Sequence, residues 1–225
     1  MKLNRKFFNR NTVLVSQELL GKILVRKIGP SASSRQATII KAKIIETEAY
    51  CGTKDLACHA SKGLTERTKV MFGPPGHSYI YMIYGMYHCL NIVTEKEGNP
   101  SAVLIRGVEL YRGPAPHYPR RVRSADLHAT EIPLSATDFV RPMEPSPNTG
   151  VPTRATPTPL NGPGKLCREL KIDRNLNAVD LTKSDLLWIE DDEIKIKKSQ
   201  IKKGKRIGVD YAGKWKDKLW RFYLG

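Results

Sequence analysis

The sequence predicts a single α+β domain built on one sheet. Strand candidates rich in β-branched and aromatic residues stand on both sides of a proline-rich stretch, so the chain does not divide into two separate domains. With 225 residues the chain can bury one large core. Prolines disfavour helices and strands in residues 112–163, so we expect this stretch to be a mobile surface insertion. We expect the domain itself to cover residues 1–225.

The expected elements follow from their residue patterns, in chain order. A helix begins near Asn11 or Thr12, both good capping residues, and ends at Gly21. A second helix lies in NGPGKLCRELKI (residues 161–172), which begins near Gly164 and has an apolar face. Alternating or continuous apolar runs predict the strands. The strand candidates are residues 22–28, 36–52, 77–85, 101–110, 185–198 and 220–225.

The charge of the chain points to a polyanionic partner. Lys and Arg number 38 against 22 Asp and Glu, which gives a formal net charge of +16 and a pI near 9.8. Such a field attracts nucleic acid or an anionic membrane surface, and nucleic acid comes first. Residues 70–94 carry no Asp, Glu, Lys or Arg, but glycines and prolines interrupt them and the remainder is too short for a membrane span. The start of the chain lacks the apolar run of a signal peptide, so we expect an intracellular protein without a membrane partner.

The uncharged stretch YIYMIYGMYHCLNI (residues 79–92) contains four tyrosines and predicts a hairpin. Tyr79 and Tyr81 share one face of its first strand. Gly85 marks a turn because glycine tolerates positive φ, which places Tyr84 and Met86 at an exposed tip. An apolar tip on a basic protein can wedge between base pairs and unstack a duplex.

Two carboxylates and several rings are the candidates for chemistry. Glu46 and Glu48 lie two apart at the end of an apolar strand and therefore on one face. Either the strand end emerges into solvent there, or one carboxylate is partly desolvated and accepts a proton. Tyr50, His59 and Tyr81 could form a slot for a flat ligand such as a nucleobase, although a lone tyrosine is usually a core residue. Arg106 ends another apolar run, as a strand-end arginine or as a site residue.

The four cysteines do not predict a disulfide framework or a metal centre. Cys51, Cys58, Cys89 and Cys167 are too few for a chain of this length to depend on disulfides. Cys58-His59 and His88-Cys89 could supply zinc ligands, but the close-spaced ligand pairs of structural zinc sites are absent. We expect no metal and no cofactor.

Five motifs, in order, resemble the alkyladenine (3-methyladenine) DNA glycosylase family. They cover most of the chain outside the proline-rich stretch, and ETEAY together with YxxYGMYxCxN is long and unusual. The motifs are IIETEAYCG (44–52), HASKGLTERTKVMFGPPGHSYIYMIYGMYHCLNI (59–92), GNPSAVLIRGVE (98–109), NGPGKLCREL (161–170) and RIGVDYAGKWKDKLWRFY (206–223).

The resemblance implies a mixed domain with a curved antiparallel sheet and a protruding β-hairpin that enters the minor groove of DNA. It implies that a damaged purine is rotated out of the duplex into a pocket, since a stacked base cannot be reached. Tyr84 matches the tyrosine that fills the resulting gap, and Met86 and Tyr87 match positions that flank it. In the pocket, Tyr50, His59 and Tyr81 match the residues that sandwich the base, and Asn91 matches the residue that bears on the amino group of guanine.

The resemblance also implies the catalytic residues. Glu48 matches the general base that activates water. Arg106 matches an arginine beside that water and the phosphate of the flipped nucleotide. The backbone of Val209 matches another contact to the water. We expect a monomeric, monofunctional enzyme that acts on double-stranded DNA with damaged purines and leaves an abasic site. It would be cytoplasmic in a prokaryote and nuclear in a eukaryote.

Two other classes of protein fit parts of the sequence. A non-catalytic nucleic-acid-binding module would use the same charge and stacking tyrosines, but it gives no reason for Glu48 beside Tyr50. A metal-dependent nuclease could use Glu46, Glu48 and an aspartate, and it would lose activity when a chelator is added.

Overall fold

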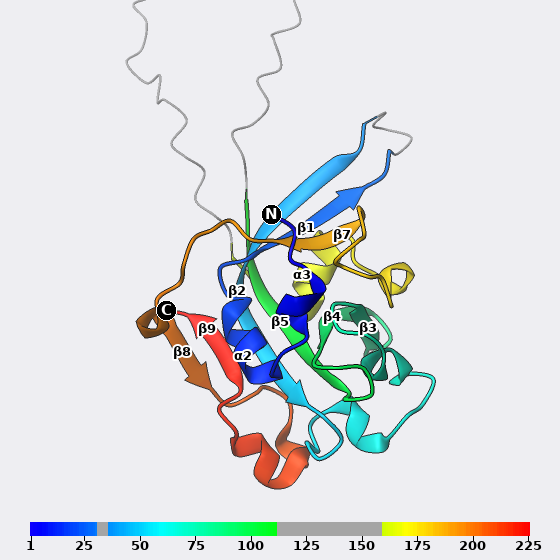
Figure 1. The fold of residues 1–225 in the computed structure, drawn as a ribbon, viewed down its shortest axis with the longest axis vertical. Helices are drawn as coiled ribbons and strands as arrows, with labels where there is room; N and C mark the ends of the chain where they lie inside the picture. Colours follow the sequence, from blue (N-terminus) through cyan, green and yellow to red (C-terminus); the bar gives the residue numbers. More distant parts are fainter. Residues whose placement is uncertain (31–35, 112–158) are drawn as a thin grey trace, which may run out of the picture. The chain divides into compact units, whose positions relative to one another are not determined.

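The computed structural model describes residues 1–30, 36–111 and 159–225, which are arranged around one sheet (Figure 1). Its main strand order is β3-β4-β5-β2-β1-β7, with β6 paired to β5 and with β9 joining β8 to β2. Each of these pairs is antiparallel. The strands are β1 (Ile23–Ile28), β2 (Thr38–Cys51), β3 (Ser78–Ile83), β4 (Tyr87–Thr94), β5 (Ser101–Leu110), β6 (Pro159–Asn161), β7 (Leu187–Glu190), β8 (Ile201–Gly204) and β9 (Arg221–Leu224).

The helices are short, and the predicted mixed fold is confirmed for the described residues. α2 begins where expected, because the Asn11 side chain accepts the backbone N–H groups of Val13 and Leu14. No helix among residues 1–30, 36–111 and 159–225 is long and apolar enough to cross a membrane. The helices are α1 (Arg5–Phe8), α2 (Thr12–Glu18), α3 (Pro163–Glu169) and the 3-10 helices η1 (His59–Lys62), η2 (Lys69–Phe72), η3 (Arg174–Leu176), η4 (Lys198–Gln200) and η5 (Asp210–Asp217).

β2 organises the sheet because it pairs on both edges. One edge pairs with β5, and the other pairs first with β1 and then with β9. The register with β5 shifts on both sides of Glu46, so that Ile45 in β2 and Arg106 in β5 have no direct partner. Opposed bulges of this kind bend a strand and redirect its side chains. They lie where the two carboxylates were expected.

One core packs between the sheet and the helices. Thr47, on the helix-facing side of β2, donates a hydrogen bond to the Ser16 carbonyl of α2. The residues of β2 that alternate with Thr47 and Ala49 therefore face away from α2. The largest fully buried side chains of the core include Phe8, Leu19, Ile44, Leu90, Ile105, Leu166, Leu170, Ile172 and Phe222.

Two expectations need correction. The strand predicted over residues 185–198 ends at Glu190, because the Asp191 side chain accepts the Glu193 N–H in a turn where Glu193 has φ +64°. Residues 159–163, expected at the end of the insertion, form β6 and the first residue of α3. The mobility predicted for residues 112–158 concerns residues outside the described part.

Candidate functional site

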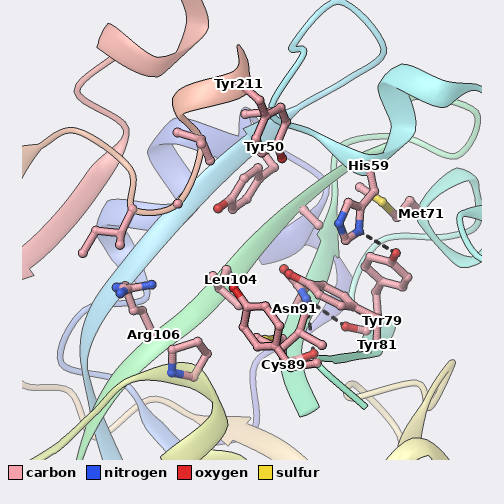
Figure 2. A pocket seen from close by; sticks show the side chains of 18 residues that line it. Tyr50, His59, Met71, Tyr79, Tyr81, Cys89, Asn91, Leu104, Arg106 and Tyr211 are labelled. Atoms are coloured by element: carbon pink, nitrogen blue, oxygen red, sulfur yellow. Dashed lines mark hydrogen bonds between the residues drawn. The ribbon is translucent and has the colours of Figure 1, made fainter. Parts of the chain in front are cut away.

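A cavity of about 400 Å³ opens beside β2, β3, β4 and β5 (Figure 2). Its volume lies within the range of small-molecule sites. Most of its wall is aromatic or apolar, with a few polar groups. Its lining includes Tyr50, His59, Met71, Tyr79, Tyr81, Tyr84, Asn91, Leu104, Arg106, Ile207, Gly208, Val209 and Tyr211.

Three rings form one wall of the cavity. The ring centroids of His59 and Tyr81 are 4.5 Å apart, and those of Tyr79 and Tyr81 are 5.4 Å apart. The Tyr79 hydroxyl lies 2.9 Å from His59 Nδ1, which fixes the imidazole (Figure 2). Tyr50, from β2, lies on another side of the cavity. The predicted Tyr50, His59 and Tyr81 therefore surround one space, and Tyr79 is a ring that the prediction left out.

His59 is neutral at neutral pH. Burial, together with the nearby positive charge of Arg67, lowers the pKa of His59 to about 4. The guanidinium of Arg67 lies 5.1 Å from the ring centroid of Tyr81. The imidazole can therefore act as a flat, uncharged wall with one donor and one acceptor nitrogen.

Glu48 contacts three residues that line this cavity and is itself 0% exposed. Its Oε2 accepts the Tyr50 hydroxyl at 2.8 Å and its Oε1 accepts the Ile207 N–H at 3.0 Å. Arg106 Nε lies 3.7 Å from Oε1. The carboxylate is not itself part of the cavity wall, but all three of these partners are.

Burial and its partners act on Glu48 in opposite directions. The pKa of Glu48 is raised overall, because burial outweighs the lowering effect of Arg106, the Ile207 N–H and the Tyr50 hydroxyl. The nearby Glu46 also raises it. Burial and the neighbouring Glu48 raise the pKa of Tyr50 as well, so the phenol keeps its proton and remains a donor. A carboxylate has about four acceptor positions, and these two hydrogen bonds use two of them. Two acceptor positions remain, but because Glu48 is 0% exposed, a water reaches them only when Tyr50, Ile207 or Arg106 shifts.

Glu46 does not emerge into solvent as a simple strand end would. Its Oε1 lies 3.2 Å from Arg106 Nε and 3.4 Å from Arg221 Nε, and its side chain is largely buried. Arg106 is equally shielded, so it is not an ordinary solvent-facing arginine. The bulge at Arg106 lets one guanidinium reach both Glu46 and Glu48.

Asn91 and Val209 also line the cavity. The Asn91 amide donates to the carbonyl oxygens of Tyr79 at 3.1 Å and Cys89 at 3.4 Å (Figure 2). The Val209 carbonyl accepts the Ala212 N–H at 2.9 Å, and a carbonyl has a second lone pair.

The predicted hairpin is present as β3 and β4. Tyr84 and Gly85 have φ +51° and +68°, and the Met86 N–H donates to the Ile83 carbonyl at 3.2 Å. Two successive positive φ angles match the right-handed twist of a hairpin. Tyr84 is 86% exposed at the tip and also borders the cavity, with Met86 exposed beside it. Tyr87 packs on Gly164 of α3, where an added Cβ would lie 3.0 Å from the tyrosine ring.

Cys58-His59 and His88-Cys89 were the pairs considered as zinc ligands. Among the described residues, no three His, Cys, Asp or Glu side chains are grouped so that they could hold a metal ion. Burial raises the pKa of Cys58 to about 12, and burial also raises the pKa of Cys89. Both therefore behave as small apolar residues of the cavity's surroundings.

Several contributors to the site were not predicted, among them Tyr79, Ile207 and Tyr211. The Tyr79 ring could have been inferred, because it shares a strand face with Tyr81. The Ile207 contact is made by a backbone amide, which leaves no signal in residue type. Tyr211, at the cavity rim, lies in the matched RIGVDYAGKW motif without a feature that marks it.

Comparisons with known proteins agree with the resemblance. Residues 6–225 match a family described as "Methylpurine-DNA glycosylase (MPG)". Similar proteins carry the name "Putative 3-methyladenine DNA glycosylase". One from Methanocella arvoryzae is 42% identical over 98% of this chain and 91% of its own length. One from Desulfitobacterium hafniense is 40% identical over 99% of this chain and 95% of its own length. One from Clostridium perfringens strain 13 is 40% identical over 100% of this chain and 96% of its own length. The chain therefore belongs to the methylpurine-DNA glycosylase family and is a DNA N-glycosylase, a hydrolase of N-glycosyl bonds that excises alkylated bases.

Proposed function

We propose that this glycosylase flips alkylated or deaminated purines out of double-stranded DNA and hydrolyses their N-glycosidic bond with an activated water. The substrates are 3-methyladenine, 7-methylguanine, hypoxanthine and ethenoadenine, and the product is an abasic site. The single observation that carries the proposal is the buried Glu48 carboxylate, held by three residues that line an aromatic cavity, Tyr50, Ile207 and Arg106.

The aromatic walls favour damaged bases. Alkylation of a ring nitrogen gives 3-methyladenine and 7-methylguanine a positive charge. Electron-rich rings such as Tyr50 and Tyr81 attract this charge by about 0.5–2 kcal/mol per contact. The neutral His59 adds no repelling charge, because its pKa is about 4. Asn91 lines the cavity, and we assign it a contact with the amino group of guanine-type bases.

The chemistry assigned to Glu48 is proton transfer and charge stabilisation. As the bond between C1′ and the base nitrogen breaks, its electron pair leaves with the base and the sugar becomes oxocarbenium-like. Water attacks C1′ and gives its proton to Glu48, while the carboxylate's charge stabilises the sugar. Arg106 and the Val209 carbonyl would orient that water. None of the described residues that line the cavity is a lysine, which favours a monofunctional enzyme without a Schiff base.

The β3–β4 hairpin is assigned to DNA insertion. Tyr84 would occupy the gap left by the flipped nucleotide, with Met86 and Tyr87 on either side in the minor groove. The exposure of Tyr84 and Met86 supports this role, because apolar side chains at a solvent-exposed tip have few intramolecular contacts to lose. One chain supplies both the cavity and the hairpin, so we expect a monomer to be active.

The test is a duplex that carries one hypoxanthine or one ethenoadenine, incubated with the protein in EDTA. Subsequent heating in alkali breaks abasic sites. We expect strand cleavage at the lesion that depends on alkali. Cleavage without alkali would refute the monofunctional mechanism, and cleavage that requires added metal would favour a nuclease. Binding without release of the base would overturn the proposed substrates.

A further inference from the structure

A buried ion pair next to the cavity has no role in the chemistry described so far. Arg206 and Asp55 have fully buried side chains and form two parallel hydrogen bonds, Nη1 to Oδ2 at 2.6 Å and Nη2 to Oδ1 at 2.9 Å. Such a pair often adds little net stability compared with apolar residues of the same volume. Its presence therefore calls for a reason other than stability.

Both members of the pair also form hydrogen bonds with backbone groups, although the buried Arg206 Nε has no partner. Arg206 also donates to the carbonyl oxygens of Ala49 at 2.9 Å and Trp215 at 3.1 Å. Asp55 also accepts the N–H groups of Cys51 and Ala57, both at 3.1 Å. These bonds join the end of β2 and the loop that follows it to the segment before η5. That segment lies more than 150 residues further along the chain.

Both groups that donate a hydrogen bond to Glu48 are direct neighbours of Arg206. Ile207, which donates to Glu48 Oε1, follows Arg206 directly in the chain. The Arg206 guanidinium lies 4.8 Å from the ring centroid of Tyr50, whose hydroxyl donates to Glu48 Oε2. The same side chain thus holds the backbone that carries one donor and the ring that carries the other.

We propose that the Asp55–Arg206 pair is a positioning unit that sets both hydrogen bonds on Glu48 and so keeps this carboxylate able to accept a proton at neutral pH. The inference rests on the proposed role of Glu48 as general base. Hydrogen bonds donated to a carboxylate favour its ionised form, whereas burial favours the protonated form. Burial already raises the pKa of Glu48 overall, so loosening the pair removes two opposing hydrogen bonds, raises this pKa further and lets Glu48 bind a proton that blocks its function.

The other groups around Glu48 do not depend on this pair. Glu46 lies on β2 itself, Arg106 comes from β5 and Cys89 from β4. By contrast, Tyr50 and the Ile207 amide are the two donors that the pair holds. Arg221 of β9 contacts Glu46 rather than Glu48. A change at Arg206 therefore acts through the two donors, with Arg106 and Glu46 still in place.

The experiment measures the single-turnover excision rate against pH on a hypoxanthine duplex, with Arg206→Lys. Lysine keeps the charge but cannot make the two parallel bonds. We expect the acid limb of the profile to move up by about one pH unit, which is about a tenfold slower rate on that limb, with near wild-type rates at high pH. Affinity for a duplex that holds an abasic analogue is expected to stay within about threefold of wild type.

Controls separate positioning from loss of structure. Arg5→Lys makes the same substitution in the Arg5–Asp180 pair, neither member of which lines the cavity, and is expected to leave the profile unchanged. A uniformly lower rate for Arg206→Lys at every pH, or no change at all, would overturn the inference. If Arg206→Lys does not fold, the uncharged double variant Asp55→Asn/Arg206→Gln replaces it, with the same expected shift.

A measurement on the unmodified protein adds an independent test. Ile207 is 47% exposed, so slow hydrogen exchange of its amide would reflect the bond to Glu48. Fast exchange in the folded wild type would overturn the inference whatever the variants do. A wild-type rate for Glu48→Gln would instead refute the proposed function, so the two failures are distinguishable.

Discussion

Replacing Glu48 by glutamine tests the central carboxylate with the smallest change in shape. The amide oxygen of glutamine can still accept the Ile207 N–H, and its NH₂ group can donate to the Tyr50 hydroxyl. Arg106 keeps Glu46 as a partner at 3.2 Å. The Tyr50 O–H then loses Glu48 as its acceptor, which offsets the gain from removing a buried charge, so we expect the variant to fold with a melting temperature close to that of wild type.

The expected loss of activity follows from what glutamine cannot do. It has no charge to stabilise an oxocarbenium-like sugar and no basic oxygen to take the proton of water. A general base contributes about 10²- to 10⁴-fold to a rate. At about 1.36 kcal/mol per tenfold, the barrier rises by about 2.7–5.4 kcal/mol. Lesion binding is expected to persist, because the ring walls are unchanged.

Single-turnover excision of hypoxanthine from a duplex, with enzyme in excess, measures this loss without interference from product release. Glu46→Gln is the matched control, since Glu46 shares Arg106 with Glu48 but contacts neither Tyr50 nor the Ile207 amide, the two hydrogen-bond donors to Glu48. We expect the control to stay within about tenfold of wild type. A folded Glu48→Gln variant with a rate within a few-fold of wild type would refute the assignment of the general base.

Three further predictions concern the hairpin and the aromatic wall. Tyr84→Ala is expected to weaken lesion binding and turnover but to change the free energy of unfolding by less than about 0.5 kcal/mol, because the side chain is 86% exposed; a large drop in a denaturant titration would place it in the core. Gly164→Ala is expected to destabilise the fold by about 1–3 kcal/mol, because its Cβ would meet the Tyr87 ring at 3.0 Å; an unchanged denaturation midpoint would contradict that packing. His59 has a folded pKa of about 4, below its unfolded value near 6.5, so stability is complete above about pH 6.5 and declines towards pH 4. In His59→Gln, thermal melts over this range are expected to depend less steeply on pH, and an unchanged slope would show that His59 does not titrate there.

Much of the fold and several site residues could be predicted from local patterns. Apolar alternation locates β2, β3 and β5, and Asn11 marks the start of α2 because its side chain can cap the first turn. A glycine after a tyrosine-rich strand predicts the hairpin and the exposure of Tyr84. These features depend on neighbours within a few residues, and such neighbours can be read along the chain.

Residue order alone left open whether Glu48 would be solvated or buried, and only the tertiary structure decided this. One of its partners, Arg106, comes from β5 and is 58 residues away in the chain. Another, the Ile207 amide, comes from the segment before η5 and is 159 residues away. The bulge that turns Arg106 towards both carboxylates arises from strand pairing, and the Ile207 donor is a backbone amide that any residue other than proline would supply. The sequence by itself thus determined which side chains were available for the site. The antiparallel pairing of distant strands decided which of them meet, because burial and hydrogen bonding depend on spatial neighbours rather than on neighbours in the chain.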